Sequence, residues 1–194
     1  MNLNSMLEAR GSRLEARGEA GDPIRVGLIG AGKFGTMFLA QARRMRGVQV
    51  VGIAYLVADR ARSSLRRAEW PEGQYAARTP EAACEHGTTC ITEDAEELIC
   101  ADGLDVIVEA TGSPVAGTRH ALSCICNGRH VAMVNVEADA LIGPEIVRQA
   151  EQAGVIYSLA YTDQPALICE LVDWARGTGF EVVAAGKGTK YLPT

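Results

Sequence analysis

Apolar residues in this chain gather in short runs separated by stretches with helical spacing. Such runs, bounded by Gly, Pro or polar residues, are typical of parallel strands buried on both faces. We expect strands at residues 23–29, 48–54, 90–92, 104–110, 130–136 and 155–160. We expect helices at residues 34–46, 59–69, 93–100, 115–127 and 144–153. Strands alternating with helices predict an α/β fold with a doubly wound parallel sheet and right-handed crossovers.

The two ends of the chain depart from this alternation. Residues 1–22 contain a short duplication, with 7–11 repeated at 14–18, and are predicted to form a helical or flexible arm. A helix over 165–176 and a strand over 180–185 lead into a turn rich in Gly and Lys. That pattern is more typical of the opening of a domain than of its end. We therefore expect a main domain over 23–162 and the beginning of a truncated substrate or dimerisation domain over 163–194.

The first predicted strand runs directly into a glycine-rich turn. Its residues are Gly30, Ala31, Gly32, Lys33, Phe34 and Gly35, which match the spacing G-x-G-x-x-G. The turn follows a buried strand and opens an amphipathic helix, and this context favours a dinucleotide-binding turn over a structural one. The first glycine permits the tight turn, the second admits a pyrophosphate, and the third allows close helix packing. We interpret residues 23–162 as a Rossmann-type dinucleotide-binding domain whose helix N-terminus attracts the phosphates.

The end of the second strand bears on the choice between NAD and NADP. NAD-specific folds usually place Asp or Glu there to bind the ribose 2′-hydroxyl, but this chain has Tyr55. Arg60 and Arg62 follow closely, and a guanidinium suits a 2′-phosphate. These residues favour NADP, with NAD possible. Two alternatives stay open: Asp59 can serve as a displaced acid, and the arginines can form a solvated helix face.

The strand over 104–110 ends in a turn of small residues. Ligands bind outside the carboxyl ends of parallel strands, and Thr111, Gly112 and Ser113 would let a ribose or nicotinamide lie against the backbone. Glu109 has apolar neighbours in sequence. A buried structural acid and a catalyst remain equally open for it.

The next strand end offers an amide and two carboxylates. We expect Asn135 to hydrogen-bond a carboxamide or a substrate oxygen. Glu137 and Asp139 are candidates for binding substrate, a metal or a proton, and N-capping of a helix is the open alternative for Asp139.

Further candidates lie beyond residue 160. Asp163 precedes a helix and either caps it or orients a catalytic group. Lys187 and Lys190 lie among glycines after an apolar run, where an ammonium can polarise a carbonyl or face a phosphate; a solvated loop is the alternative. The predicted catalytic set is therefore Lys187, Lys190, Glu137 and Asp163.

Composition excludes several functional classes. The chain has 194 residues and a net charge of −5, so it has no global attraction for nucleic acid or anionic membranes. No apolar run is long enough to span a membrane, and residues 1–22 lack the apolar core of a secretory signal. The six cysteines lack C-x-x-C spacing and the three histidines are scattered, so we expect reduced thiols, no metal site and a cytoplasmic location.

Four segments together resemble a known group of enzymes. They are Val26–Gly35, Val108–Gly112, Val134–Asp139 and Asp163–Glu170. They look like homoserine-dehydrogenase-like NAD(P)-dependent oxidoreductases, in the branch that has an SAF domain and includes a 1-deoxy-D-xylulose-5-phosphate-reductoisomerase-like enzyme. The resemblance covers Pro23 to Pro193 and implies that substrate and SAF domains would follow Thr194.

The chain departs from that family pattern at three places. Homoserine dehydrogenases usually have Thr-Ala-Asn-Lys where this chain has 134–137, so their nicotinamide-side lysine is absent and homoserine is not the expected substrate. Family members typically have Ala-Asp where this chain has Ala54-Tyr55, which bears on cofactor choice. They have Tyr-Gly-Asp where this chain has 161–163, at an edge that faces the ligand.

Together these features predict an oxidoreductase that transfers hydride between NADP(H) and a carbonyl or alcohol of a small polar substrate. In this hypothesis Lys187 or Lys190 polarises the substrate oxygen, and Glu137 or Asp163 orients it. A nucleotide-binding module without turnover is the rival hypothesis. Apolar surface left by the truncation also predicts a homodimer.

Overall fold

Six parallel strands form one sheet in the order β3-β2-β1-β4-β5-β6. The computed structural model describes residues 13, 15–160 and 164–186. The strands are β1 (Ile24–Ile29), β2 (Val48–Ala54), β3 (Cys90–Thr92), β4 (Val106–Glu109), β5 (His130–Met133) and β6 (Tyr157–Leu159). The order reverses between β1 and β4, which is the doubly wound topology predicted from the sequence. The predicted α/β fold is therefore confirmed.

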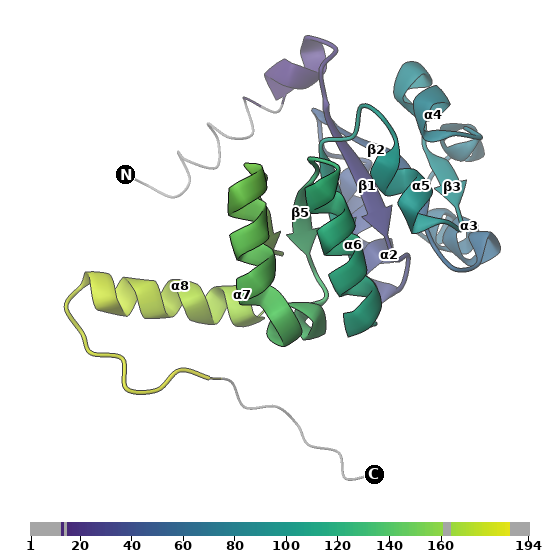
Figure 1. Ribbon diagram of the computed structural model, residues 1–194. Helices are drawn as coiled ribbons and strands as arrows, with labels where there is room; N and C mark the ends of the chain where they lie inside the picture. Colours follow the sequence, from purple (N-terminus) through teal and green to yellow (C-terminus); the bar gives the residue numbers. More distant parts are fainter. Residues whose placement is uncertain (1–12, 14, 161–163, 187–194) are drawn as a thin grey trace.

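Helices cover both faces of the sheet (Figure 1). They are α2 (Lys33–Ala42), α3 (Ala58–Arg67), α4 (Pro80–His86), α5 (Ala95–Cys100), α6 (Pro114–Cys126), α7 (Val136–Ala153) and α8 (Gln164–Gly177), with a 3-10 turn η1 at Glu72–Tyr75. Alternate residues of β1 point to opposite faces: Leu28 packs with α2 and α3, whereas Ile29 packs with α5, α6 and α7. The central strands are buried on both sides for this reason, and their sequences are nearly all apolar.

Two elements were not predicted, η1 and α4. The helix α4 has its own local signals: the Thr79 hydroxyl accepts a hydrogen bond from Ala82 N, Pro80 occupies the first turn, and Gly87 ends the helix with φ of 65°. Helix α4 has only two buried residues, Pro80 and Ala83. The apolar periodicity was therefore too weak to indicate it.

The predicted boundary at residue 136 is wrong. β5 ends at Met133, and α7 begins at Val136, well before the predicted helix start at Pro144. The Asn135 side chain accepts a hydrogen bond from Ala138 N and so caps the helix. Pro144 lies inside α7, just after a kink at Ile142, instead of at its first turn.

The predicted strand over 180–185 is also wrong, because this segment has no regular structure. Phe180 and Val183 are 68 % and 89 % exposed. An apolar run becomes a strand only when another strand accepts its backbone hydrogen bonds, and none of the described residues does so here. The preceding helix α8 projects away from the sheet (Figure 1).

Candidate functional site

The glycine turn lies at the carboxyl end of β1, where the strand order reverses. Gly30 has φ of 101°, a conformation that favours glycine. A Cβ atom on Gly30 would lie 2.5 Å from the carbonyl oxygen of Ala110, so the turn is pressed against the end of β4. A Cβ on Gly35 would collide with the carbonyl oxygen of Gly30, which confirms that this position needs close backbone packing.

Gly32 differs from the other two glycines of the turn. It is the N-cap of α2 and has no side chain to cap the helix, and a Cβ built on it would have no atom within 4 Å. The helix also has no acidic residue in its first turn. The positive end of the helix therefore opens onto free space, as an anion-binding helix N-terminus requires.

Two hollows adjoin this helix N-terminus. The first, which we call the dinucleotide groove, has a volume of about 430 Å³ and crosses the ends of β1, β2 and β4. Its lining includes Gly30, Gly32, Tyr55, Leu56, Glu93, Ala110, Thr111, Gly112, Ser113 and His120. The glycine turn and the turn after β4, predicted separately as cofactor contacts, thus line one groove.

The second hollow, which we call the basic pocket, lies between α2 and α3 and has a volume of about 650 Å³. Its lining includes Ala31, Gly32, Lys33, Thr36, Tyr55, Arg60, Ser63, Ser64 and Arg67. Tyr55 lines both hollows, so the basic pocket is a lateral continuation of the groove at the end of β2. Ser64 is buried, and its hydroxyl donates to the carbonyl of Ala31, which ties α3 to the glycine turn.

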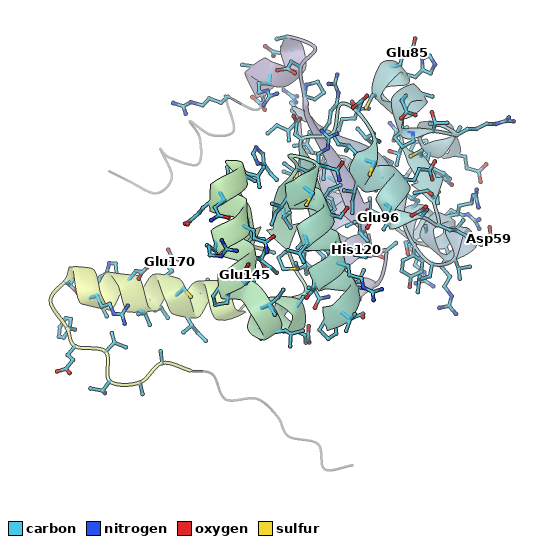
Figure 2. The ribbon with its side chains drawn as sticks, in the orientation of Figure 1. Asp59, Glu85, Glu96, His120, Glu145 and Glu170 are labelled. Carbon is cyan, nitrogen blue, oxygen red and sulfur yellow. The ribbon has the colours of Figure 1, made fainter. Side chains whose placement is uncertain are left out.

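The remaining candidates for contact with the cofactor line neither the groove nor the basic pocket. Arg62 pairs with Asp59 at 3.1 Å, and neither residue lines the groove or the basic pocket. Figure 2 shows Asp59 at the outer edge of α3. Phe34 is 38 % exposed and lies outside both linings. The arginines of α3 therefore divide between a pocket and a solvated face.

A buried polar cluster, made of Glu109, Thr111, His120 and Asn135, adjoins the groove, and its members Thr111 and His120 line it. Glu109 is fully buried, and its Oε1 accepts a hydrogen bond from the Thr111 hydroxyl. His120 Nδ1 lies 3.2 Å from the same oxygen. Asn135 is 2 % exposed and donates to Thr111 Oγ1 at 3.2 Å and to the carbonyl of Ser113 at 2.8 Å. The cluster fixes the turn after β4 that forms one wall of the groove.

Asn135, Glu137 and Asp139, the candidate residues that follow β5, have different surroundings because α7 begins earlier than predicted. Asn135 caps α7 from inside the cluster, so the alternative interpretation of Asp139 as a helix N-cap is wrong. Asp139 instead accepts a hydrogen bond from the Tyr157 hydroxyl at 2.8 Å, and burial together with this carboxylate raises the pKa of Tyr157 strongly. Glu137 is exposed in the first turn of α7 and lines neither hollow.

Three of the predicted catalytic residues, Asp163, Lys187 and Lys190, lie outside the described residues. The sequence analysis in turn missed His120 and Arg67. A signal for His120 exists, since it follows Gly117 by three positions and precedes Cys124 by four, and both are on the buried stripe of α6. Arg67 lies seven positions after Arg60, two helical turns along the same face of α3.

All six cysteines are free thiols. Burial raises the pKa of Cys90 to about 11 and that of Cys124 to about 12, so neither thiol is activated as a nucleophile. No helix in the described part of the chain is both long and apolar enough to traverse a bilayer.

Comparison with known proteins agrees with the geometry. Homoserine dehydrogenase from Pseudomonas aeruginosa is 33% identical over 134 residues, which are 69% of this chain and 28% of that protein. A 4-carboxy-2-hydroxymuconate-6-semialdehyde dehydrogenase from Sphingobium is 23% identical over 140 residues, or 72% of this chain and 38% of that protein. The chain thus spans well under half the length of these relatives.

Solved structures of oxidoreductases share the fold. A homoserine dehydrogenase from Thiobacillus denitrificans superposes with a TM-score of 0.56 and 25% identity, covering 71% of this chain and 29% of that one. Biliverdin reductase from Synechocystis, in complex with biliverdin and NADP+, has a TM-score of 0.55 at 16% identity, covering 71% of this chain and 37% of that one. The latter likeness shows the fold alone.

Two family descriptions match successive parts of the sequence. Residues 162–194 match "Oxidoreductase DRL, catalytic domain". Residues 27–160, more than half of the chain, match "Homoserine dehydrogenase, NAD binding domain". With the glycine turn, the open helix N-terminus and the groove at the strand-order reversal, this match shows that the chain belongs to the NAD-binding domain family of the homoserine dehydrogenases, which are oxidoreductases.

Proposed function

We propose that this chain binds NADP(H) in the dinucleotide groove and belongs to a reductase or dehydrogenase that transfers hydride to or from a small polar substrate. The observation that carries the proposal is the helix N-terminus at Gly32, which faces open space with no cap and no acid in its first turn. A pyrophosphate is the group in a dinucleotide that such a site attracts. The turn at Thr111, Gly112 and Ser113 would then support the nicotinamide ribose.

NADP is proposed over NAD because of the basic pocket. Lys33, Arg60 and Arg67 supply three cations beside Tyr55, and Ser63 adds a hydroxyl. No carboxylate is among the residues that line this pocket, so nothing there would repel a 2′-phosphate. Arginine suits this role because its guanidinium can bind a phosphate through two hydrogen bonds.

Fluorescence titration of the chain with NADPH and NADH tests this proposal. Arg60→Ala and Arg67→Ala should each weaken NADPH binding by about tenfold or more, the value of a lost charge-assisted hydrogen bond, and leave NADH binding within about twofold. Arg62→Ala is the matched control, because Arg62 lies on the same helix but outside the pocket. Tighter binding of NADH than of NADPH by the wild type would contradict the preference for NADP.

We propose that catalysis involves three residues beyond position 160, together with Glu137 of the main domain. Lys187 or Lys190 would polarise the substrate oxygen, with Asp163 or Glu137 orienting it. NADPH oxidation should be followed with sugar phosphates, aldoses and semialdehydes as substrates, for wild type and for Lys187→Ala and Lys190→Ala. Tight NADPH binding without turnover of any substrate would favour a non-catalytic nucleotide-binding module.

We also propose that the chain forms a homodimer in the cytoplasm. Leu171, Trp174 and Phe180 are each about two-thirds exposed, and together they give α8 and the segment after it an apolar surface that a partner would cover. The six free thiols are consistent with a reducing compartment. Light scattering on the purified chain should give twice the mass of a monomer. The Trp174→Lys variant should have the mass of a single monomer.

A further inference from the structure

Among the described residues that line the dinucleotide groove, Glu93 is the one acidic side chain. It directly follows β3 and lies beside the end of β2, because Tyr55 N donates a hydrogen bond to the carbonyl of Thr92 at 3.0 Å. Its Oε1 accepts a hydrogen bond at 2.8 Å from Ala58 N, at the first residue of α3. In the described part of the chain Oε2 has no such partner. One oxygen of Glu93 thus holds the start of α3, and the other is available to a ligand of the groove.

The turn that carries Glu93 is fixed by local hydrogen bonds. The Thr92 hydroxyl accepts a hydrogen bond from Asp94 N at 3.1 Å and donates one to the carboxylate of Glu97. Asp94 in turn caps α5, because its Oδ1 accepts from Glu96 N at 2.8 Å. None of these three neighbouring carboxylates lines the groove. The turn therefore presents Glu93 alone to the groove.

Apolar side chains line the groove together with Glu93. They are Leu56 after β2, Ala95 at the first residue of α5, and Ala116 in the first turn of α6. We call this part the apolar end of the groove. Leu56 is 88 % exposed, so a flat apolar ligand would remove much of its surface from water. Apolar walls with one well-placed polar group are typical of a site that binds an aromatic ring by its faces and orients it by its edge.

The proposed phosphate positions direct the adenosine half of the cofactor to this end of the groove. With the pyrophosphate at Gly32 and the 2′-phosphate in the basic pocket, the adenosine ribose lies at Tyr55, where the basic pocket joins the groove. The base and the 2′-oxygen project from opposite faces of the ribose ring. A 2′-phosphate in the basic pocket therefore leaves the base in the groove, beside Leu56 and Glu93. The inference that follows rests on the proposed function for this reason.

We propose that the apolar end of the groove binds the adenine ring, and that Glu93 determines specificity for this base by accepting a hydrogen bond from its 6-amino group through Oε2. Adenine carries a donor at this edge, the 6-amino group. A carboxylate can only accept hydrogen bonds. It therefore favours adenine over hypoxanthine, which has a carbonyl oxygen in place of the amino group. Glu93 is in this way a specificity residue for the end of the cofactor that does not react.

The experiment compares Kd for NADPH with Kd for its hypoxanthine analogue, reduced nicotinamide hypoxanthine dinucleotide phosphate, by fluorescence titration. The wild type should bind NADPH about tenfold more tightly, the value of one hydrogen bond to a charged group. Glu93→Gln should reduce this ratio to within about threefold, because an amide accepts from an amino group and also donates to a carbonyl. Glu97→Gln is the matched control, since Glu97 lies on the adjoining helix α5 but outside the groove, and it should keep the wild-type ratio.

The ratio of the two Kd values separates base recognition from a purely structural role of Glu93. If Glu93 only holds Ala58 N at the start of α3, Glu93→Gln changes both affinities by the same factor and the ratio stays as in the wild type. That result, or a wild-type ratio near one, overturns the inference and leaves the proposed function intact. The wild-type ratio needs no variant, so this part of the test does not depend on the folding of a mutant. A wild-type chain that binds neither dinucleotide overturns both.

Discussion

Two glycine-to-alanine substitutions in the glycine turn distinguish an effect on cofactor binding from an effect on folding. At Gly32 the backbone has φ of −72° and ψ of −153°, which an alanine adopts without strain, and the added Cβ meets no protein atom within 4 Å. At Gly35 the same Cβ would collide with the carbonyl oxygen of Gly30. Gly32→Ala therefore adds a methyl group to the space proposed for the pyrophosphate, and Gly35→Ala adds one to the packed interior of the turn.

The magnitudes follow from these surroundings. A substitution that touches no other atom usually changes the free energy of unfolding by less than about 0.5 kcal/mol, which is the expectation for Gly32→Ala. Overpacking against backbone costs about 1–3 kcal/mol, as expected for Gly35→Ala. If the methyl group of Gly32→Ala removes one backbone hydrogen bond to the pyrophosphate, the loss of about 1.5–3 kcal/mol weakens cofactor binding by roughly 10- to 150-fold.

Urea unfolding and NADPH titration of the two variants test this reasoning together. We expect Gly32→Ala to unfold as the wild type does and to bind NADPH weakly, and Gly35→Ala to be less stable. At one fixed NADPH concentration, the melting temperature of the wild type should rise more than that of Gly32→Ala. A Gly32→Ala variant with wild-type affinity would refute the assignment of this space to the pyrophosphate.

Three further changes probe the groove wall and the core. Asn135→Ala should lower the free energy of unfolding by about 2–3 kcal/mol in urea titrations, because it removes the cap of α7 and two buried hydrogen bonds. Gly117→Ala should lower the melting temperature, although Ala normally favours a helix, since its Cβ would lie 2.6 Å from Asn135 Nδ2 and 3.1 Å from Glu109 Oε2. Burial raises the pKa of the Cys124 thiol from 9.0 to about 12, so the unfolded state loses this proton at lower pH than the folded state does. The free energy of unfolding should therefore fall between pH 9 and pH 12, by at most about 1.4 kcal/mol per pH unit. Urea titrations at pH 8 and pH 10 should show that Cys124→Ala lacks this part of the pH dependence.

The sheet was predictable because its central strands are buried on both faces. β1 and β2 are almost continuous apolar runs, and each is followed by a helix with a clear buried stripe. The groove was predictable for a related reason, since parallel strands place their carboxyl ends at one edge of the sheet. Tyr55 and Thr111, which are distant in sequence, therefore line the same hollow.

Features that depend on partners distant in sequence were not predictable. The apolar pattern of residues 180–185 fits a strand, but a pattern does not supply the neighbouring strand that would pair with it. Asn135 was assigned to a strand end because Val134 and Val136 flank it, and valine is typical of strands. Its amide caps a helix instead, a choice decided by buried contacts with Thr111 and Ser113.

The buried polar cluster shows why the roles of single residues at this site could not be predicted from the sequence one residue at a time. Glu109 was left open between a structural acid and a catalyst, and His120 was counted only among the three scattered histidines. In the structure the two residues are neighbours: His120 Nδ1 lies 3.2 Å from Glu109 Oε1, and His120 also lines the groove, so the imidazole joins that carboxylate to the groove. Because Asn135 and Thr111 belong to the same network, substitutions at these positions should be non-additive in cofactor affinity. The polar side chains beside the groove therefore depend on contacts between β4, α6 and the start of α7. A sequence motif contains only one of these segments at a time, so it does not predict the contacts between them.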